Sequence, residues 1–304
     1  MSETTKADGE TDPRRPAADG ADGADGAHRV GSDAPFLTLM ISIGLLYVLL
    51  IVGMIASNFF YTSPAKFAEV LASPQVQYST ALSLITCTCS AILSVWVAIP
   101  IGYIMSRYRF RAESVVDAIL DIPIVLPPLC VGISLLILFQ TPLGTAIDRG
   151  FAGLMAVLGA PQIDGISYEV PAVILAQFTV AAAFSVRTMR VTFEQIDPRA
   201  EQVALTLGCN QRQAFLHVAL PQAWRGVVAA FTLAWARSLG EFGPILIFAG
   251  VTPFKTEVLS STVYLAFNRA DLAAAVAVSI LMITLSVAVL LFTRVLGIRR
   301  EVMR

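Results

Sequence analysis

Long apolar segments without a charged residue restrict the fold of this chain more than any other feature. Residues 36–56 and 79–106 contain no Asp, Glu, Lys or Arg. At about 1.5 Å per helical residue, each segment is long enough to cross roughly 30 Å of hydrocarbon. Of all 304 residues, 56% are hydrophobic and 14% are charged, which is too apolar for a soluble domain of this length. The sequence therefore predicts an all-α, polytopic membrane protein.

Six apolar segments predict six transmembrane helices. They are residues 36–56, 79–106, 122–147, 170–186, 226–254 and 272–293. Pro123, Pro127 and Pro128 open the third segment, which predicts a broken or tightly turned start because proline lacks an amide hydrogen. A seventh run at 151–163 is short and contains glycines and a proline, which suits an interfacial or re-entrant segment better than a crossing.

The basic residues are unevenly divided between the two sides that six crossings would create. One side would hold Lys66, Arg149, Lys255 and Arg269, and the other would hold twelve arginines. The twelve are Arg107, Arg109, Arg111, Arg187, Arg190, Arg199, Arg212, Arg225, Arg294, Arg299, Arg300 and Arg304. The positive-inside rule makes the arginine-rich side cytoplasmic. The predicted location is the inner membrane of the cell, with both termini in the cytoplasm.

The first 33 residues differ from the rest in composition. They carry eight acidic against four basic residues and repeat Ala-Asp-Gly three times in succession. Such a segment has too little apolar surface to order itself. We expect residues 1–33 to be a disordered acidic cytoplasmic tail without a signal peptide, and residues 34–304 to be the membrane domain.

A polar island at residues 197–221 separates two apolar regions and, by the same charge count, lies in the cytoplasm. Asp197 can cap a helix that begins at Pro198, because its carboxylate accepts hydrogen bonds from amides that lack a helical partner. Gly208 suits a left-handed helix end. A first short helix is therefore expected to begin at Pro198 and to end at Gly208.

A second short helix is expected after this glycine bend. Asn210 can cap it while Gln213 reaches back, and Pro221 is expected to interrupt it. Apolar faces are assigned to Ala204, Leu207, Phe215, Leu216 and Leu220, whereas Arg199, Glu201, Arg212 and His217 are expected to be solvated. Such a piece lies outside the bilayer and offers a face to a partner.

The chain shows no nucleotide site of its own. A P-loop needs Gly-Lys-Ser/Thr so that backbone amides and the lysine hold phosphates, but Lys6, Lys66 and Lys255 follow Thr, Ala and Phe. No metal-ligand cluster or nucleophile–base pair is visible, and His28 and His217 are the only histidines. We expect no catalytic residue, metal or cofactor here, so that any ATP hydrolysis occurs in a partner subunit.

Arg237 and Glu241 are unusual because they lie inside the predicted fifth span. They are four residues apart and can pair on one helical face, and ionisable groups at membrane depth are functional candidates by default. The alternative is a structural pair near the cytoplasmic end of the helix, where long side chains reach the interface. Gly240 and Gly243 would loosen this helix where a gate bends.

The polar island resembles the cytoplasmic loop of permease subunits of bacterial binding-protein-dependent ABC importers. That loop carries Glu-Ala-Ala, three residues, Gly, nine residues, Ile, one residue and Leu-Pro. The second half is matched here by Gly208, Val218, Leu220 and Pro221. The resemblance implies an ABC importer permease fold with six transmembrane helices.

The first half of the loop pattern departs from the family. The Glu-Ala-Ala positions are held by Gln202, Val203 and Ala204, and the acid stands one place early at Glu201. In the family this loop is the coupling helix, which docks into a groove of the ATPase subunit. The resemblance implies that role for residues 202–208.

Other stretches resemble the molybdate, tungstate and sulfate branch of these permeases. The run 237–243 looks like its fifth-helix signature, and Pro127 and Pro128 resemble the start of its third helix. Residues 141–144, 173–177 and 185–187 extend the likeness, which covers residues 78–296. Gln177 is assigned to the translocation pathway, with a buried interhelical hydrogen bond as the more common fate of such a residue.

The resemblance also implies the assembly. We expect a homodimer of this chain in the membrane lipid, beside two copies of an ATPase subunit and one extracytoplasmic substrate-binding protein that supplies selectivity, and no nucleic acid. The expected cargo is molybdate or a related oxyanion. Alternatives are an importer for ferric iron, thiamine or polyamine, an ion-coupled secondary carrier, and a non-transporting membrane scaffold.

Overall fold

A computed structural model describes residues 34–157, 159 and 164–299. Within these ranges the chain is helical and contains no β-strand, as predicted. The predicted tail at 1–33 lies outside the described residues. The described part of the chain divides into two units between Val52 and Gly53, and this boundary falls inside α1 (Ala34–Tyr61).

Four helices of the described residues are long and apolar enough to cross a membrane. They are α1, α3 (Pro74–Arg107), α7 (Val170–Glu194) and α13 (Leu272–Arg299). Each contains one of the predicted spans. A short helix, α2 (Pro64–Ala72), precedes α3, and Ser63 and Ser73 cap the two by accepting hydrogen bonds from Lys66 N and Val76 N.

The third predicted span, 122–147, is not one helix. It is divided among α4 (Glu113–Val125), α5 (Pro128–Gln140) and α6 (Pro142–Val157), and α4 and α5 are bent by 111° at their junction. Pro127 and Pro128 supply no amide hydrogen, and Leu126 before them takes an extended conformation at φ −64° and ψ 138°. The predicted break is therefore confirmed at Pro127 and Pro128, whereas Pro123 lies inside α4.

The fifth predicted span, 226–254, is also interrupted. α11 (Trp224–Leu239) ends before Gly240, and a π-helical turn, η2 (Ile245–Ala249), follows. The next helix, α12 (Leu259–Asn268), leads to α13. By length and composition the described residues hold four membrane-crossing helices, or five if the bent α4–α5 pair is one span, so six crossings remain a prediction.

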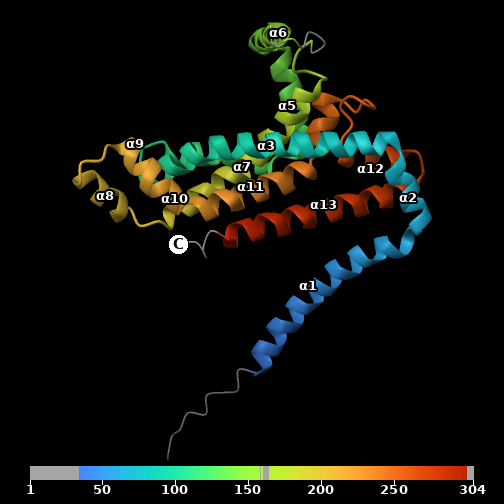
Figure 1. Cartoon of the computed structure of the whole chain (residues 1–304), viewed down its shortest axis with the longest axis horizontal. Helices are drawn as coiled ribbons and strands as arrows, with labels where there is room; N and C mark the ends of the chain where they lie inside the picture. The colour runs from blue at the N-terminus through green and yellow to red at the C-terminus, as the bar shows by residue number, and fades with distance from the viewer. Residues whose placement is uncertain (1–33, 158, 160–163, 300–304) are drawn as a thin grey trace, which may run out of the picture. The chain divides into compact units, whose positions relative to one another are not determined.

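Within the second unit, α3, α7 and α11 pack side by side, and α13 packs on α11 and α12 (Figure 1). Small side chains on α3 permit this approach, because Ser79, Ser83, Ser90 and Ser94 are all buried. Gly102 lies so close to α7 that a Cβ atom there would be 2.8 Å from the Met189 Cβ. Contacts of this kind bring the helix backbones together without large apolar side chains.

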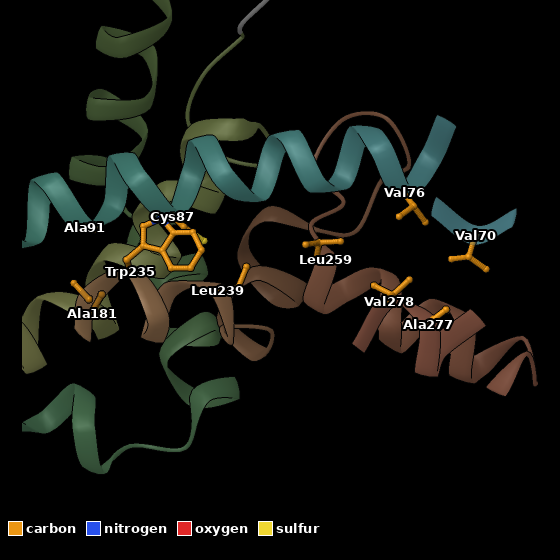
Figure 2. Close-up of a cluster of buried hydrophobic side chains, with 11 residues drawn as sticks. Val70, Val76, Cys87, Ala91, Ala181, Trp235, Leu239, Leu259, Ala277 and Val278 are labelled. Carbon is orange, nitrogen blue, oxygen red and sulfur yellow. The ribbon is translucent and has the colours of Figure 1, made fainter. Parts of the chain in front are cut away.

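Figure 2 shows a cluster of buried apolar side chains at the centre of this packing. Cys87 and Ala91 of α3 face Ala181 of α7 and Trp235 of α11. The Trp235 indole nitrogen donates to Thr88 Oγ1 at 3.2 Å, so its polar atom is satisfied at the same interface. α3, α7 and α11 thereby form a packed support for the loops at their ends.

Candidate functional site

The polar island folds as predicted over its first part. α8 (Arg199–Thr206) begins one residue later than expected, and Asp197 Oδ1 accepts the amide of Arg199 at 2.9 Å. Gly208 ends it at φ +93°, the left-handed conformation that glycine adopts without strain. The predicted capping box is present, since Asn210 Oδ1 accepts Gln213 N at 2.8 Å and Gln213 Oε1 accepts Asn210 N at 2.9 Å.

Pro221 does not interrupt the second helix, which is a correction. α9 (Gln211–Ala214) widens into a π-helical turn, η1 (Phe215–Ala219), and continues as α10 (Leu220–Gln222). A proline inside an α-helix lacks an amide hydrogen, and its ring collides with the carbonyl one turn before it. The wider π-helical turn of η1, directly before Pro221, relieves both effects. The chain thus stays helical until Ala223 and enters α11 directly.

Glu201 is not solvated as expected but is 7% exposed. Its Oε2 accepts the Tyr103 hydroxyl at 2.7 Å, and its Oε1 accepts the Arg107 Nε at 2.9 Å. The Arg107 Nη2 lies 2.8 Å from the same Oε1. The carboxylate is buried because two donors at the end of α3 replace the water it leaves.

Arg107 extends these contacts to a third segment. Its Nη1 donates to the carbonyl of Phe193 at 2.8 Å and its Nη2 to the carbonyl of Ile196 at 3.1 Å, at the end of α7. One guanidinium therefore joins α3, α7 and α8. The sequence reasoning missed Tyr103 and Arg107 as site residues, and the available signal was an arginine directly after the long uncharged segment.

The opposite face of α8 is apolar and open. Val203 is 57% exposed and Leu207 is 80% exposed, and Gln202 beside them is exposed as well. Ala204 faces inward and is buried. The sequence predicts Leu207 on an apolar face, and in the structure that face points away from the chain, because Glu201 rather than Leu207 has its partner on α3.

Arg237 and Glu241 form the predicted ion pair at the end of α11. The Arg237 Nη1 lies 2.7 Å from Glu241 Oε1, and the guanidinium lies 5.7 Å from the centre of the Phe184 ring. The Glu241 side chain is 1% exposed and that of Arg237 is 32% exposed. Glu241 is therefore the enclosed partner, and Ser260 Oγ also donates to its backbone carbonyl at 2.7 Å.

The segment 240–244, between α11 and η2, packs against the bend between α4 and α5. A Cβ atom on Gly243 would be 2.9 Å from Pro128 Cβ, and one on Gly132 would be 2.9 Å from Pro244 Cα. The structure thus brings the predicted gate residues Gly243 and Pro128 into contact, with Pro127 at the bend beside them. Gly240 is exposed and lines an open cavity of about 560 Å³ with Phe242, Ser260, Tyr264, Ser279 and Met282.

Gln177 lies away from these residues, in the interface of α3 and α7. Its Oε1 accepts the Ser90 hydroxyl at 3.1 Å, and its Nε2 lies 3.6 Å from the Cys87 Sγ. The residue is 1% exposed. In this conformation it makes an interhelical hydrogen bond with Ser90, the more common fate of such a residue, and its role in the pathway remains a prediction.

A second polar network joins the opposite ends of the same helices and was not found from the sequence. Glu257 is fully buried, and its carboxylate accepts Gln75 Nε2 at 2.8 Å and Thr262 Oγ1 at 2.9 Å. Nearby, Lys255 pairs with Glu169. These contacts hold the segment between η2 and α12 onto the start of α3 and the start of α7.

A third charged cluster fastens α4 to α7. Arg190 pairs with Glu113 at 3.2 Å, with Glu194 at 2.8 Å and with Asp117. The acidic residues of α4 recur along one face of the helix, which is why one arginine can reach two of them. Among the residues that the structure describes, no group of three or more His, Cys, Asp or Glu side chains is arranged to hold a metal ion.

Known proteins resemble this chain in sequence. A sulfate transport system permease protein, CysT of Salmonella typhimurium, is 29% identical over 261 residues, covering 84% of this chain and 90% of the relative. A molybdate/tungstate transport system permease protein, WtpB of Pyrococcus furiosus, is 33% identical over 226 residues, covering 74% of this chain and 80% of the relative.

The fold has been seen in a solved structure. A bacterial alginate ABC transporter in complex with an alginate pentasaccharide-bound periplasmic protein contains a chain that matches with a TM-score of 0.64 and 17% identity. The match covers 86% of this chain and 92% of that chain. At this identity the likeness concerns the fold alone.

A sequence profile of one family matches residues 98–302, a range that includes the polar island, the end of α3 with Arg107 and the Arg237–Glu241 pair. It begins after the start of α3 and ends in the last part of the chain, so it spans more than half of the 304 residues. The chain belongs to the binding-protein-dependent transport system inner membrane components, a family of multi-pass ABC importer permeases.

Proposed function

We propose that this chain is the transmembrane permease subunit of an ATP-driven importer and forms the pathway for molybdate or a related oxyanion, tungstate or sulfate. The observation that carries the proposal is α8, a short helix held by Arg107 to two long helices while Val203 and Leu207 remain open. Relatives named for sulfate and for molybdate/tungstate support the class of cargo.

A separate ATPase subunit, present in two copies, supplies the energy. The open apolar face of α8 supports this, because Val203 on the helix is 57% exposed and Leu207 directly after it is 80% exposed, outside the long apolar segments. Residues 197–221 dock this subunit, with Gln202 and Gly208 at the contact, and Leu220 and Pro221 lead its motion into α11. The permease itself is not an enzyme.

Two copies of this chain form the pathway and receive the anion from an extracytoplasmic binding protein. The segment between η2 and α12, pinned by Glu257, belongs to the receiving side, and the loop 197–221 lies in the cytoplasm. The arginines near α8, set against the few basic residues at the other helix ends, support this orientation. Both termini, including the tail at 1–33, are then cytoplasmic.

The gate lies where the break in the fifth segment meets the bent third segment. Gly243 and Pro128 touch without space for a methyl group, which supports a closed contact between η2 and α5 in this state. Arg237, Glu241 and Gly240 at the end of α11 and Pro127 at the bend are assigned to the same gate, and Gln177 is assigned to the pathway further along α7. An opening motion would separate η2 from α5 at this point.

Uptake of radiolabelled molybdate into liposomes that contain the complete transporter tests the proposal. We expect uptake that requires ATP on the α8 side and the binding protein on the other side, and that tungstate and sulfate inhibit to different degrees. Leu207→Asp should release the ATPase subunit, whereas Leu207→Met should retain it because the apolar contact is kept. Uptake without ATP, driven by an ion gradient, would show a secondary carrier instead.

A further inference from the structure

Glu201 stands near the place where the family pattern has its acidic residue, yet it points into the protein. Its side chain is 9% exposed, and the Arg107 side chain that pairs with it is 10% exposed. A docked partner on the open face of α8 meets Val203 and Leu207, which lie on the other side of the helix. The carboxylate is therefore not available for a contact across that interface.

We propose that Glu201, Arg107 and Tyr103 form a clamp within this chain that makes α8 move as one body with the ends of α3 and α7. In this reading Glu201 is a positioning residue for coupling and not a contact to the ATPase. The inference rests on the proposed function, because it says how motion received at α8 reaches the membrane helices.

The hydrogen-bond geometry supports a rigid connection. Arg107 uses Nε and Nη2 on the Glu201 carboxylate and Nη1 and Nη2 on the carbonyls of Phe193 and Ile196. A planar guanidinium with several fixed donors restricts the rotation of α8 about its own axis, which a single contact would not do. Removing either charged partner leaves the other buried without its counter-charge.

Aromatic packing extends the clamp to the second helix of the loop. The Tyr103 ring meets Phe193 edge-on at 5.4 Å and Phe215 at 4.7 Å between ring centroids. Phe215 is the first residue of η1, which continues the second short helix. Tyr103 therefore contacts both short helices of the loop, η1 through its ring and α8 through the hydrogen bond from its hydroxyl to Glu201. The loop therefore cannot tilt as a hinge without breaking contacts on α3.

The test uses the complete transporter in liposomes and measures molybdate moved per ATP hydrolysed. For Glu201→Gln and Arg107→Gln we expect the ATPase to co-purify and ATP hydrolysis to continue, while uptake per ATP falls on the order of tenfold. Tyr103→Phe, which removes one hydroxyl and keeps the ring, should give a smaller fall. Exposed matched controls outside the docking loop, Glu69→Gln and Arg111→Gln, should leave uptake per ATP unchanged.

The charge exchange that combines Arg107→Glu with Glu201→Arg should recover part of the uptake that either change alone removes. Loss of the ATPase from Glu201→Gln during purification would overturn the inference by making Glu201 a partner contact. Unchanged uptake per ATP in both single variants would overturn it as well. Failure of the proposed function is separate, since the unmodified transporter would then take up no molybdate with ATP.

Discussion

At the scale of single residues, the functional candidates differ in whether backbone conformation or a distant partner determines their role. Gly208 needs only its own φ of +93°, and nothing lies within 4 Å of where its Cβ would be. Glu241 needs Arg237, which lies one helical turn before it. Glu201 needs Arg107, which is 94 residues away. Substitutions at these three kinds of position should therefore fail for different reasons.

Gly208→Val should weaken retention of the ATPase without affecting membrane insertion. A β-branched residue in the left-handed region costs about 1–2 kcal/mol, and the chain avoids this by unwinding the end of α8. Co-purification of the ATPase with the permease measures the effect. Gly208→Asn is the matched control, because asparagine tolerates this conformation; equal loss in both variants would contradict the explanation.

Arg237→Ala should be more harmful than Glu241→Ala. The first change leaves a carboxylate that is 1% exposed without its cation, at about 3–5 kcal/mol, whereas the second leaves an arginine whose side chain is only partly enclosed, at 32% exposed. The thermal unfolding temperature of the purified permease and uptake by the whole transporter show which of the two variants is more harmful. The double alanine variant should lose less than the sum of the two, and additive losses would show that the pair does not interact.

At the scale of helices, the interruptions say more about the proposed gate than the continuous helices do. α4 and α5 meet at 111°, and α11 stops before Gly240 and resumes as η2. Both breaks lie together, since Gly243 touches Pro128 and Gly132 faces Pro244. A helix pair with glycine on each side of the contact can part and close again without repacking large side chains.

Gly243→Ala should impair transport by forcing η2 and α5 apart. The added methyl group would lie 2.9 Å from Pro128 Cβ and 3.1 Å from Leu129 N, an overpacking of about 1–3 kcal/mol. Molybdate entry that depends on ATP should fall, or molybdate should also enter without ATP; uptake measured with and without ATP distinguishes the two. Gly240→Ala is the control, because its nearest neighbour is 3.8 Å away; if both variants behave alike, the contact is not the cause.

At the scale of the whole molecule, polar clusters fasten both ends of the helix bundle. Arg107 and Glu201 join α3, α7 and α8 at one end, while Glu257, Gln75 and Thr262 join the start of α3 to the segment before α12 at the other. The packed small residues between them, such as Ala91 and Ala181, leave little freedom for one helix to slide alone. Motion received at α8 is therefore expected to travel as rigid-body displacement of several helices.

Accessibility of introduced cysteines tests the orientation of this bundle. In a background without the four native cysteines, Arg212→Cys should react with a membrane-impermeant maleimide only after the membrane is opened. Asn268→Cys, at the end of α12, should react from outside in intact cells. The charge distribution is the reason, because twelve arginines lie on the side predicted to be cytoplasmic. The reverse pattern would place α8 outside and remove its role in coupling to an ATPase.

The sequence alone determined the features that depend on neighbouring residues. The uncharged segments became α1, α3, α7 and α13, and Pro127 and Pro128 marked the bend. The hydrogen bond from Arg199 N to Asp197, the cap at Asn210 and the turn at Gly208 were predictable because each involves residues only a few positions apart. Arg237 and Glu241 paired because helical geometry places residues four apart on one face.

Only the tertiary structure decided which polar residues are buried and which apolar residues remain open. Periodicity on α8 assigned Glu201 to solvent and Leu207 to an apolar face, but a carboxylate is buried where a distant arginine and tyrosine satisfy it, and Arg107 comes from another helix. The same holds for Glu257 with Gln75, which are 182 residues apart. Local pattern specifies helices and their ends, whereas the burial of charge depends on partners that only folding brings within hydrogen-bonding distance.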